Sequence, residues 1–293
     1  MRSTGEYKAD IQRKAVRIPS GTPIVEEGRS IPSLRVRSCP ANQQSARTVG
    51  PVVSVRDATG SAQRERVQRH AMTTRWRQYI EKGVRDAGGP VAFGLQQWAF
   101  LFPIYVTISQ VLAKGGRILD VGCGAGIFTA LIAHHGYDAV GVDEDPDIVS
   151  FAQDMVNYFR SPARIEQASA FDLSAYHGSF GLAYSLGVVE HFDRKVTIQL
   201  IQEQARCANL VLVAVPTRYT RYAGEVTDER LYTRRQVEQM VSEAGLSVRR
   251  SYVYGEVPTA LAKNLERFLP RAAYTRLKNA FSYGMGIVVL GSR

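Results

Sequence analysis

The sequence predicts an α/β protein with a seven-stranded, mostly parallel sheet and helices on both of its faces. From residue 117 onward, short apolar runs alternate with amphipathic segments of helical period, which is the pattern of βαβ units. A glycine-rich turn directly after the first run joins that run to a helix. The seven runs, each a predicted strand, are 117–121, 138–142, 163–167, 182–186, 209–215, 247–254 and 286–290.

Two of the intervening helices carry clear signals at their ends. Asp145 is a favourable N-cap residue, and Pro146 then takes the first helical position. Thr233 and Gln236 have the spacing of a capping box, and Gly245 marks the end of the second helix. The apolar stripes expected to face the core are Ile148, Phe151, Ala152, Met155 and Phe159 in the first helix and Val237, Met240, Val241 and Ala244 in the second.

The first quarter of the chain differs from the rest in charge. The formal net charge is +10, and residues 1–71 hold 13 Lys and Arg against 6 Asp and Glu, whereas the remaining residues hold 24 against 21. Apolar residues of 1–71 recur with neither a helical nor a strand period, so we expect a disordered basic segment before a domain over 72–293. The segment is either a solvated tail or a basic arm for RNA or an acidic membrane. A third hypothesis is that translation begins at Met72.

Ahead of the first strand, residues 73–85 and 91–113 are predicted to be helical and to form an N-terminal helical cap. The most apolar stretch, 98–108, is too short to span a bilayer and contains Pro103, so a buried helix is expected there. The three cysteines, Cys39, Cys123 and Cys207, have no metal-binding spacing, and the chain begins without an apolar signal region. Both observations favour a cytoplasmic protein.

The strongest motif is the glycine loop after the first strand, with Asp120 two residues before its first glycine. Glycines in this place let a ligand lie against the backbone, and the N–H groups at the helix start favour an anionic or polar ligand group. A dinucleotide fingerprint has the order G-x-G-x-x-G, which would require glycine where the chain has Ile127. The spacing is instead G-x-G-x-G over Gly122, Gly124 and Gly126, which argues against a dehydrogenase.

This arrangement resembles motif I of the class I S-adenosylmethionine-dependent methyltransferases, in particular the small-molecule enzymes that act on ubiquinone precursors. The resemblance covers roughly residues 100–255 and a last strand near 286–290. It implies a Rossmann-like, doubly wound sheet with an antiparallel last hairpin strand. It also implies that the loop and its acid lie beside the methionine moiety of the cofactor, through Asp120, Gly122, Cys123, Gly124 and Gly126.

Residues that follow the second and third strands extend the resemblance. Asp143 closes the second strand, where a carboxylate can accept both ribose hydroxyls, and Glu144 beside it is a weaker candidate. After the third strand the family often has an acid near the adenine amino group, where this chain has the uncharged Ser169. Backbone groups at Ala170 could still contact the base, and Phe171 either covers the adenine or belongs to the core.

The fourth strand and the residues after it resemble the family's F-D-x-V and L-E-H segment. Leu186 stands where the strand end faces the cofactor. His191 is the candidate general base, although a role in holding the loop by hydrogen bonds is the slightly favoured alternative. The family's common Asp is replaced by Gly181, and some relatives carry an acid, linked to a metal, at Gly187. With Glu190 and His191 alone, no metal site is expected.

Three residues outside this segment are weak candidates for facing an acceptor. They are Tyr219 and Tyr222 after the fifth strand and, earlier in the chain, His177.

The resemblance therefore implies methyl transfer from S-adenosylmethionine to a small-molecule acceptor by in-line displacement. The helices over 73–113 and an amphipathic, basic insertion over 256–282 are expected to cover the acceptor. Contact of this insertion with a membrane is the less favoured reading, and nucleic acid is not the expected partner. Two alternatives stay open: an RNA methyltransferase that uses the basic N-terminal arm, and a regulator that binds the cofactor without catalysis, for which Ser169, Gly181 and Gly187 are the motivation.

Overall fold

The computed structural model describes residues 76–220, 229–257 and 259–293, except the side chains of Ala260 and Lys263. All of them belong to one compact unit, Val55–Arg293. The expectations for the basic segment 1–71, for Met72 as the start of translation and for Tyr222 fall outside the described residues.

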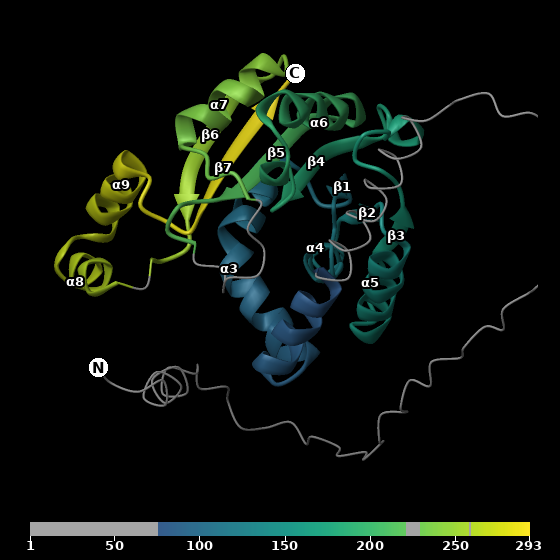
Figure 1. Ribbon diagram of the computed structural model, residues 1–293, viewed down its shortest axis with the longest axis horizontal. Helices are drawn as coiled ribbons and strands as arrows, with labels where there is room; N and C mark the ends of the chain where they lie inside the picture. The colour runs from purple at the N-terminus through teal and green to yellow at the C-terminus, as the bar shows by residue number, and fades with distance from the viewer. Residues whose placement is uncertain (1–75, 221–228, 258) are drawn as a thin grey trace, which may run out of the picture. The chain divides into compact units, whose positions relative to one another are not determined.

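The predicted seven-stranded sheet is confirmed. Its order is β3-β2-β1-β4-β5-β7-β6, in which β7 runs antiparallel to both of its neighbours and the other pairs are parallel (Figure 1). The strands are β1 Arg117–Val121, β2 Asp138–Asp143, β3 Arg164–Gln167, β4 Phe180–Leu186, β5 Ala208–Pro216, β6 Ser247–Tyr254 and β7 Gly286–Ser292. Because the order reverses direction between β1 and β4, a crevice is expected at the carboxyl ends of these strands.

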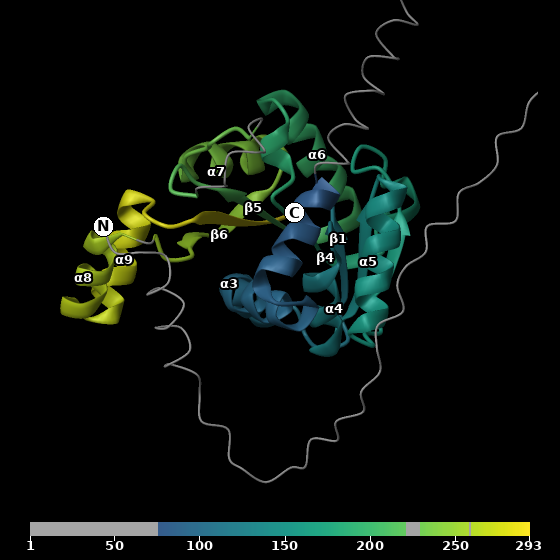
Figure 2. The same cartoon turned by 60° about the horizontal axis from the view of Figure 1, so that its bottom comes forward.

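Helices cover both faces of the sheet, as Figures 1 and 2 show. One face packs against α3 Pro90–Val111, α4 Ile127–His134 and α5 Pro146–Tyr158, and the other against α6 Arg194–Cys207 and α7 Arg234–Glu243. Successive residues of each central strand face opposite layers; in β4, for example, Leu182 and Tyr184 enter the core on the α3 side and Ala183 faces away from it. Short 3-10 turns follow β3 and β4, namely η1 Ser174–Tyr176 and η2 Val189–His191.

The capping signals are confirmed, but one apolar face is rotated from its expected position. Asp145 accepts hydrogen bonds from the N–H groups of residues 147 and 148, and Thr233 and Gln236 form the full capping box. The buried residues of α5 are Ile148, Val149, Ala152 and Val156, whereas the expected Phe151, Met155 and Phe159 are only half-buried. The face is rotated because the β-branched Val149 and Val156 enter the core on the α3 side.

The N-terminal helical cap is present, with helix over residues 76–87 followed by α3. By length and composition α3 is apolar enough to span a membrane, but its Leu101, Ile104 and Ile108 belong to the core against the sheet. The expectation of a buried helix therefore holds for this face of α3. On the remaining surface Val91 and Leu95 are exposed.

The insertion over 256–282 forms two helices, α8 Ala260–Phe268 and α9 Arg271–Phe281. Helix α9 contacts β6, which is an edge strand, and strands β4, β5 and β7 separate β6 from β1. The insertion therefore packs at the far end of the sheet from the glycine loop that follows β1. Its expected role as a cover for the acceptor stays a prediction.

Candidate active site

The loop between β1 and α4 has glycine at three positions that share a left-handed backbone but differ in their surroundings. Gly122, Gly124 and Gly126 have φ values of 73°, 52° and 66°, in the left-handed region that disfavours side chains. A Cβ at Gly122 would lie 2.6 Å from Val188 Cγ2, so this glycine allows the chain after β4 to approach the loop. At Gly124 the nearest atom to such a Cβ is Ile80 Cδ1 at 4.0 Å, an ordinary van der Waals distance, so a side chain there would not clash.

The carboxylate of Asp143 joins the end of β2 to this loop. Its Oδ2 accepts a hydrogen bond of 3.2 Å from the N–H of Gly124, and its Oδ1 accepts one of 3.2 Å from the N–H of Asp145. The carbonyl of Val142 also accepts from the N–H groups of Gly122 and Cys123, at 2.8 and 2.9 Å. Burial raises the pKa of Asp143 above its usual value, and the two backbone donors oppose this shift. The glycine loop and the acid after β2 are therefore in direct contact, as the sequence predicts.

The end of β3 lies against the same place. The N–H of Ala168 donates to the carbonyl of Asp143 at 3.0 Å, and the Ser169 hydroxyl donates to Glu144 Oε2 at 3.2 Å. The ring of Phe171 is about half exposed and meets the edge of Phe192, with 5.3 Å between ring centroids. The candidate residues after β1, β2 and β3 therefore gather at one edge of the sheet, and Phe171 lies at their surface and outside the core.

Asp120, the acid before the loop, is buried beneath it. Its Oδ2 accepts hydrogen bonds from the hydroxyls of Thr129, at 2.5 Å, and Tyr184, at 2.8 Å. Burial raises the pKa of this carboxyl to about 7, although the two hydroxyl donors act in the opposite direction. Asp120 thus ties β1 to α4 and β4 from below the loop. The sequence did not indicate Thr129 or Tyr184, because a hydroxyl on an apolar strand or helix is not distinctive without its partner.

Cys123 lies between the first two glycines and supports the loop from inside. A Cβ at Gly141 of β2 would lie 2.9 Å from Cys123 Cβ, so the two residues are in close contact. Burial and the nearby carboxyls of Asp120 and Asp143 raise the pKa of the thiol well above its usual value. Cys123 therefore packs the loop against β2.

The helix over residues 76–87 covers the loop, which the sequence predicted only as a general cap. Ile80 is buried and is the side chain nearest to Gly124. At the start of this segment the Trp76 ring meets the ring of His191 edge to face, with 5.5 Å between centroids. One helix thus contacts both the glycine loop and the turn after β4. Ile80 and Trp76 were missed as site residues, because nothing in a local helical pattern indicates which loop it will cover.

The turn η2 holds the candidate base and a group that could bind a metal ion. Glu190 is buried and His191 is half-buried, and the carboxylate of Glu229 comes close to both from the chain before α7. One ligand atom from each of these three residues lies within 4.8 Å of the others. The backbone N–H of Arg230 also donates to the carbonyl of Glu190 at 2.9 Å. The sequence indicated only Glu190 and His191 as possible metal ligands, because Glu229 does not belong to a recognisable motif.

Among the other candidates, Leu186 and Tyr219 lie at the carboxyl edge of the sheet, and His177 does not. Leu186 ends β4 and is half-buried against the core, and Tyr219 follows β5 and contacts Tyr283 with 4.9 Å between ring centroids. His177 comes just before β4 begins and its Nε2 pairs with Glu203 of α6 at 2.8 Å. Its expected place beside an acceptor is therefore wrong: it lies at the opposite edge and stabilises the start of β4.

A doubly wound sheet of this order, with a glycine-rich loop after β1 hydrogen-bonded to the acid that ends β2, defines a Rossmann-like domain. Residues 118–209 match the family described as a methyltransferase domain. This segment runs from β1 to the start of β5 and includes every predicted cofactor-contacting residue.

Individual relatives match over parts of the chain. A ubiquinone biosynthesis O-methyltransferase of Azorhizobium caulinodans is 37% identical over 78 residues, which are 27% of this chain and 31% of the relative. A second, from Rhizobium etli, is 26% identical over 112 residues, 38% of this chain and 45% of the relative. The matches thus span less than half of these relatives. The solved magnesium protoporphyrin IX methyltransferase of Synechocystis with bound SAH has a TM-score of 0.51 and 15% identity, over 76% of this chain and 94% of that one, which shows the shared fold.

Proposed function

We propose that this chain is an S-adenosylmethionine-dependent methyltransferase with a small-molecule acceptor. The observation that carries the proposal is the hydrogen bond from the Gly124 N–H to the Asp143 carboxylate. This bond supports the proposal because it holds the Asp143 carboxylate, the proposed ribose acceptor, against the loop at Gly124, which itself has no side chain. A ligand with an adenosine at one end and an amino acid at the other fits such a neighbourhood, because the acid can accept from ribose hydroxyls and the loop exposes backbone.

Each predicted contact residue has a role in this proposal. Asp143, with Glu144 as a weaker candidate, would bind the ribose, and the loop over 122–126 above Asp120 would hold the methionine moiety. The half-buried Ser169 and Ala170 would contact the adenine, and Leu186 would face the cofactor from the end of β4. Ser169 donates to Glu144, so these two candidate side chains are in direct contact.

We expect the methyl acceptor to lie near the turn after β4 and the helix over residues 76–87, which covers that turn. S-adenosylmethionine supplies a methyl group on a positively charged sulfur, which an acceptor atom displaces in line. The protein therefore contributes mainly orientation, which can be worth roughly 7–11 kcal/mol. His191, packed against Trp76, would take a proton from an acceptor hydroxyl, a contribution of about 10²–10⁴-fold. The matched relatives are named O-methyltransferases, which favours a hydroxyl acceptor.

Ligand-induced thermal shift tests the cofactor assignment. We expect S-adenosylmethionine and S-adenosylhomocysteine to stabilise the protein, by about 2.7 kcal/mol at a hundred times their Kd, and NAD to have no effect. Preferential stabilisation by NAD would contradict the proposal.

Two substitutions test the residue roles. Asp143→Ala should remove most of the shift, because the ribose loses its acceptor, whereas Asp147→Ala, an exposed acid on α5, should leave the shift unchanged. His191→Ala should keep the shift and lower methyl incorporation from an isotope-labelled donor incubated with cell extract. An unchanged affinity in Asp143→Ala, measured by calorimetry, would count against the ribose assignment.

A further inference from the structure

The α8–α9 hairpin is attached to the sheet through polar contacts. Lys278 of α9 is buried and pairs with Glu256 at 2.6 Å, and the Tyr274 hydroxyl donates to the same carboxylate at 2.6 Å. Asn279 Oδ1 accepts from the backbone N–H of Val253 in β6 at 2.9 Å. Among the described side chains, none of α8 or α9 belongs to the three hydrophobic clusters of the core. The side of the hairpin that faces the protein therefore combines these polar contacts with the buried Ala262 and the Tyr274 ring, outside the main core clusters.

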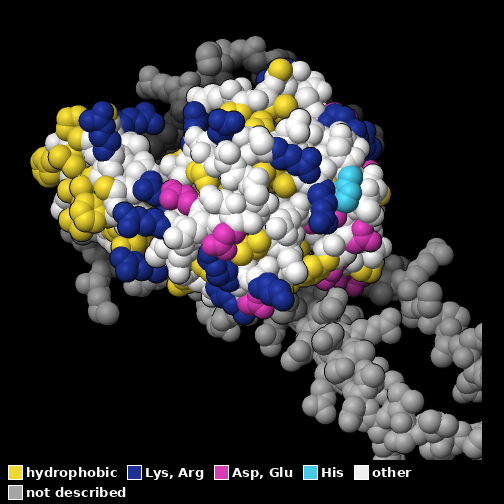
Figure 3. Space-filling view, turned by 90° about the horizontal axis from the view of Figure 1, so that it is seen from above, with side chains coloured by type: hydrophobic (Ala, Val, Ile, Leu, Met, Phe, Trp, Pro, Cys, Tyr) yellow, Lys and Arg dark blue, Asp and Glu magenta, His cyan; other side chains and the backbone are white. Residues whose placement is uncertain are grey.

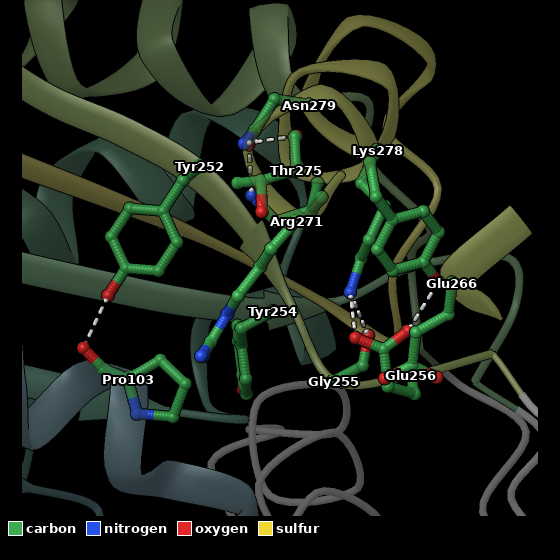
Figure 4. A pocket seen from close by; sticks show the side chains of 12 residues that line it. Pro103, Tyr252, Tyr254, Gly255, Glu256, Glu266, Arg271, Thr275, Lys278 and Asn279 are labelled. Atoms are coloured by element: carbon green, nitrogen blue, oxygen red, sulfur yellow. Dashed lines mark hydrogen bonds and ion pairs between the residues drawn. The ribbon is translucent and has the colours of Figure 1, made fainter. Parts of the chain in front are cut away.

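A cavity of about 690 Å³ lies between α9, the end of β6 and Pro103 of α3 (Figure 4). Arg271, the first residue of α9, extends into this cavity towards Tyr254, and in the described part of the chain it forms no ion pair. The cavity beneath the hairpin therefore contains the Arg271 cation together with the carboxylates of Glu256 and Glu266.

Three large apolar side chains of the hairpin, Leu261, Phe268 and Phe281, face the solvent, whereas Ala262 and Tyr274 are buried and Leu265 is half-buried. In α8, Leu261, Leu265 and Phe268 follow the i, i+4, i+7 spacing of one helix face, and the exposed fractions of Leu261 and Phe268 are 61% and 74%. At the end of α9, Phe281 is 69% exposed. A surface helix of a globular domain normally turns its apolar stripe towards the core. This reversed orientation indicates that a second surface covers the stripe.

The charge of the hairpin indicates which surface that is. Residues 259–282 contain five Lys and Arg and one acid, Glu266, and Arg267, Arg271 and Arg276 are exposed. Figure 3 shows the hairpin as a lobe with apolar side chains at its outer end and Lys and Arg around them. Two copies of this lobe would repel each other, whereas an anionic surface would be attracted. Apolar residues flanked by Lys and Arg are typical of helices that lie in the interface of an anionic bilayer.

We propose that the α8–α9 hairpin docks the protein on an anionic lipid bilayer. Leu261, Phe268 and Phe281 enter the boundary between headgroups and acyl chains, and Arg267 and Arg276 contact lipid phosphates. The hairpin is a peripheral anchor, so this proposal agrees with the expectation of a cytoplasmic protein. It does not depend on methyl transfer, because the hairpin shares no residue with the glycine loop or with η2.

Vesicle flotation of the full chain tests the proposal. We compare phosphatidylcholine vesicles with vesicles that also contain phosphatidylglycerol, and expect binding to the second kind, weakened by salt. Phe268→Ser with Phe281→Ser should weaken binding roughly tenfold or more, because two large apolar groups no longer leave water. Arg267→Glu and Arg276→Glu should each weaken binding at least about fivefold.

The controls separate the hairpin from the basic N-terminal segment and from other exposed groups. Leu95→Ser on α3 removes an apolar side chain of 65% exposure, and Arg235→Glu reverses an exposed charge on α7; neither should change vesicle binding. Every hairpin variant should keep the thermal shift with S-adenosylmethionine, which shows that the domain is folded.

Three outcomes would overturn the proposal. The first is that the full chain does not bind vesicles containing phosphatidylglycerol. The second is that it binds them but the hairpin variants bind as well as the original chain, which would assign the contact to another segment. The third is a concentration-dependent dimer in sedimentation velocity that Phe268→Ser abolishes while vesicle binding persists, which would assign the apolar face to a second copy of the chain.

Discussion

Asp120 shows how the environment of one residue changes its chemistry. Its carboxyl lies under the glycine loop, accepts from Thr129 and Tyr184, and has a pKa raised to about 7 by burial. In the unfolded chain an aspartate ionises near pH 4. The folded state therefore resists ionisation between about pH 4 and 7, and this residue makes the folded state less stable, relative to the unfolded state, as the pH rises through that interval.

Replacing this carboxyl by an amide should remove the pH dependence. The oxygen of Asp120→Asn can still accept from Thr129 and Tyr184, but the side chain no longer ionises. Relative to the original protein, we expect the free energy of unfolding of the variant to rise by about 1–3 kcal/mol between pH 5 and pH 8. Urea denaturation at both pH values measures this difference. Asp154→Asn, an exposed change on α5, is the control, and an equal pH dependence in both variants would contradict the prediction.

At the scale of elements, the site is the meeting of three strand ends and one covering helix. The loop after β1 accommodates the chain after β4 closely at Gly122, whereas at Gly124 a Cβ would meet only Ile80, at 4.0 Å. The two glycines share a left-handed conformation but have different surroundings, so equal substitutions at them should have unequal effects.

A pair of alanine substitutions tests this difference. Gly124→Ala should lower the free energy of unfolding by about 1–2 kcal/mol, because alanine disfavours the left-handed conformation. It should also reduce the thermal shift with S-adenosylmethionine, because its methyl group enters the proposed ligand space. Gly122→Ala should cost more than Gly124→Ala, by roughly 1–3 kcal/mol, because its Cβ would also clash with Val188. Urea denaturation and thermal shift measure the two effects. Equal losses of stability in the two variants would contradict the prediction, because they would show that Val188 moves aside without a loss of folding free energy.

At the scale of the whole molecule, the sheet separates two surfaces. The glycine loop follows β1, and the α8–α9 hairpin packs at the β6 edge, with β4, β5 and β7 between them. The segment with the largest excess of positive charge, residues 1–71, precedes both of them in the chain.

Deletion of residues 1–71 tests whether the domain depends on that segment. We expect the melting temperature and the thermal shift with S-adenosylmethionine to be unchanged, because the described loop, sheet and covering helix are joined by contacts within 76–293. A lost ligand shift would place part of the site in the deleted segment. If the deletion instead removes a salt-sensitive affinity for RNA, the alternative of an RNA methyltransferase gains support.

Much of this protein could be derived from local sequence. Alternation of apolar runs with helical segments predicted all seven strands, because burial of a parallel sheet requires such runs. The bounds of β1 and β6 were predicted to the residue, and the caps at Asp145 and Thr233 were confirmed because a cap depends on neighbours within three positions. The glycine spacing and the acid at Asp143 are local signals as well, and the structure brings them into contact.

Only the tertiary structure decided the contacts between residues far apart in the chain. It paired Tyr184 with Asp120, placed Ile80 over Gly124, brought Glu229 to His191 and moved His177 to the opposite edge of the sheet. It also turned the apolar face of α8 outward, although the sequence shows only that the helix is amphipathic. Local pattern fixes which residues of an element share a face, whereas the packing of distant elements decides what that face meets.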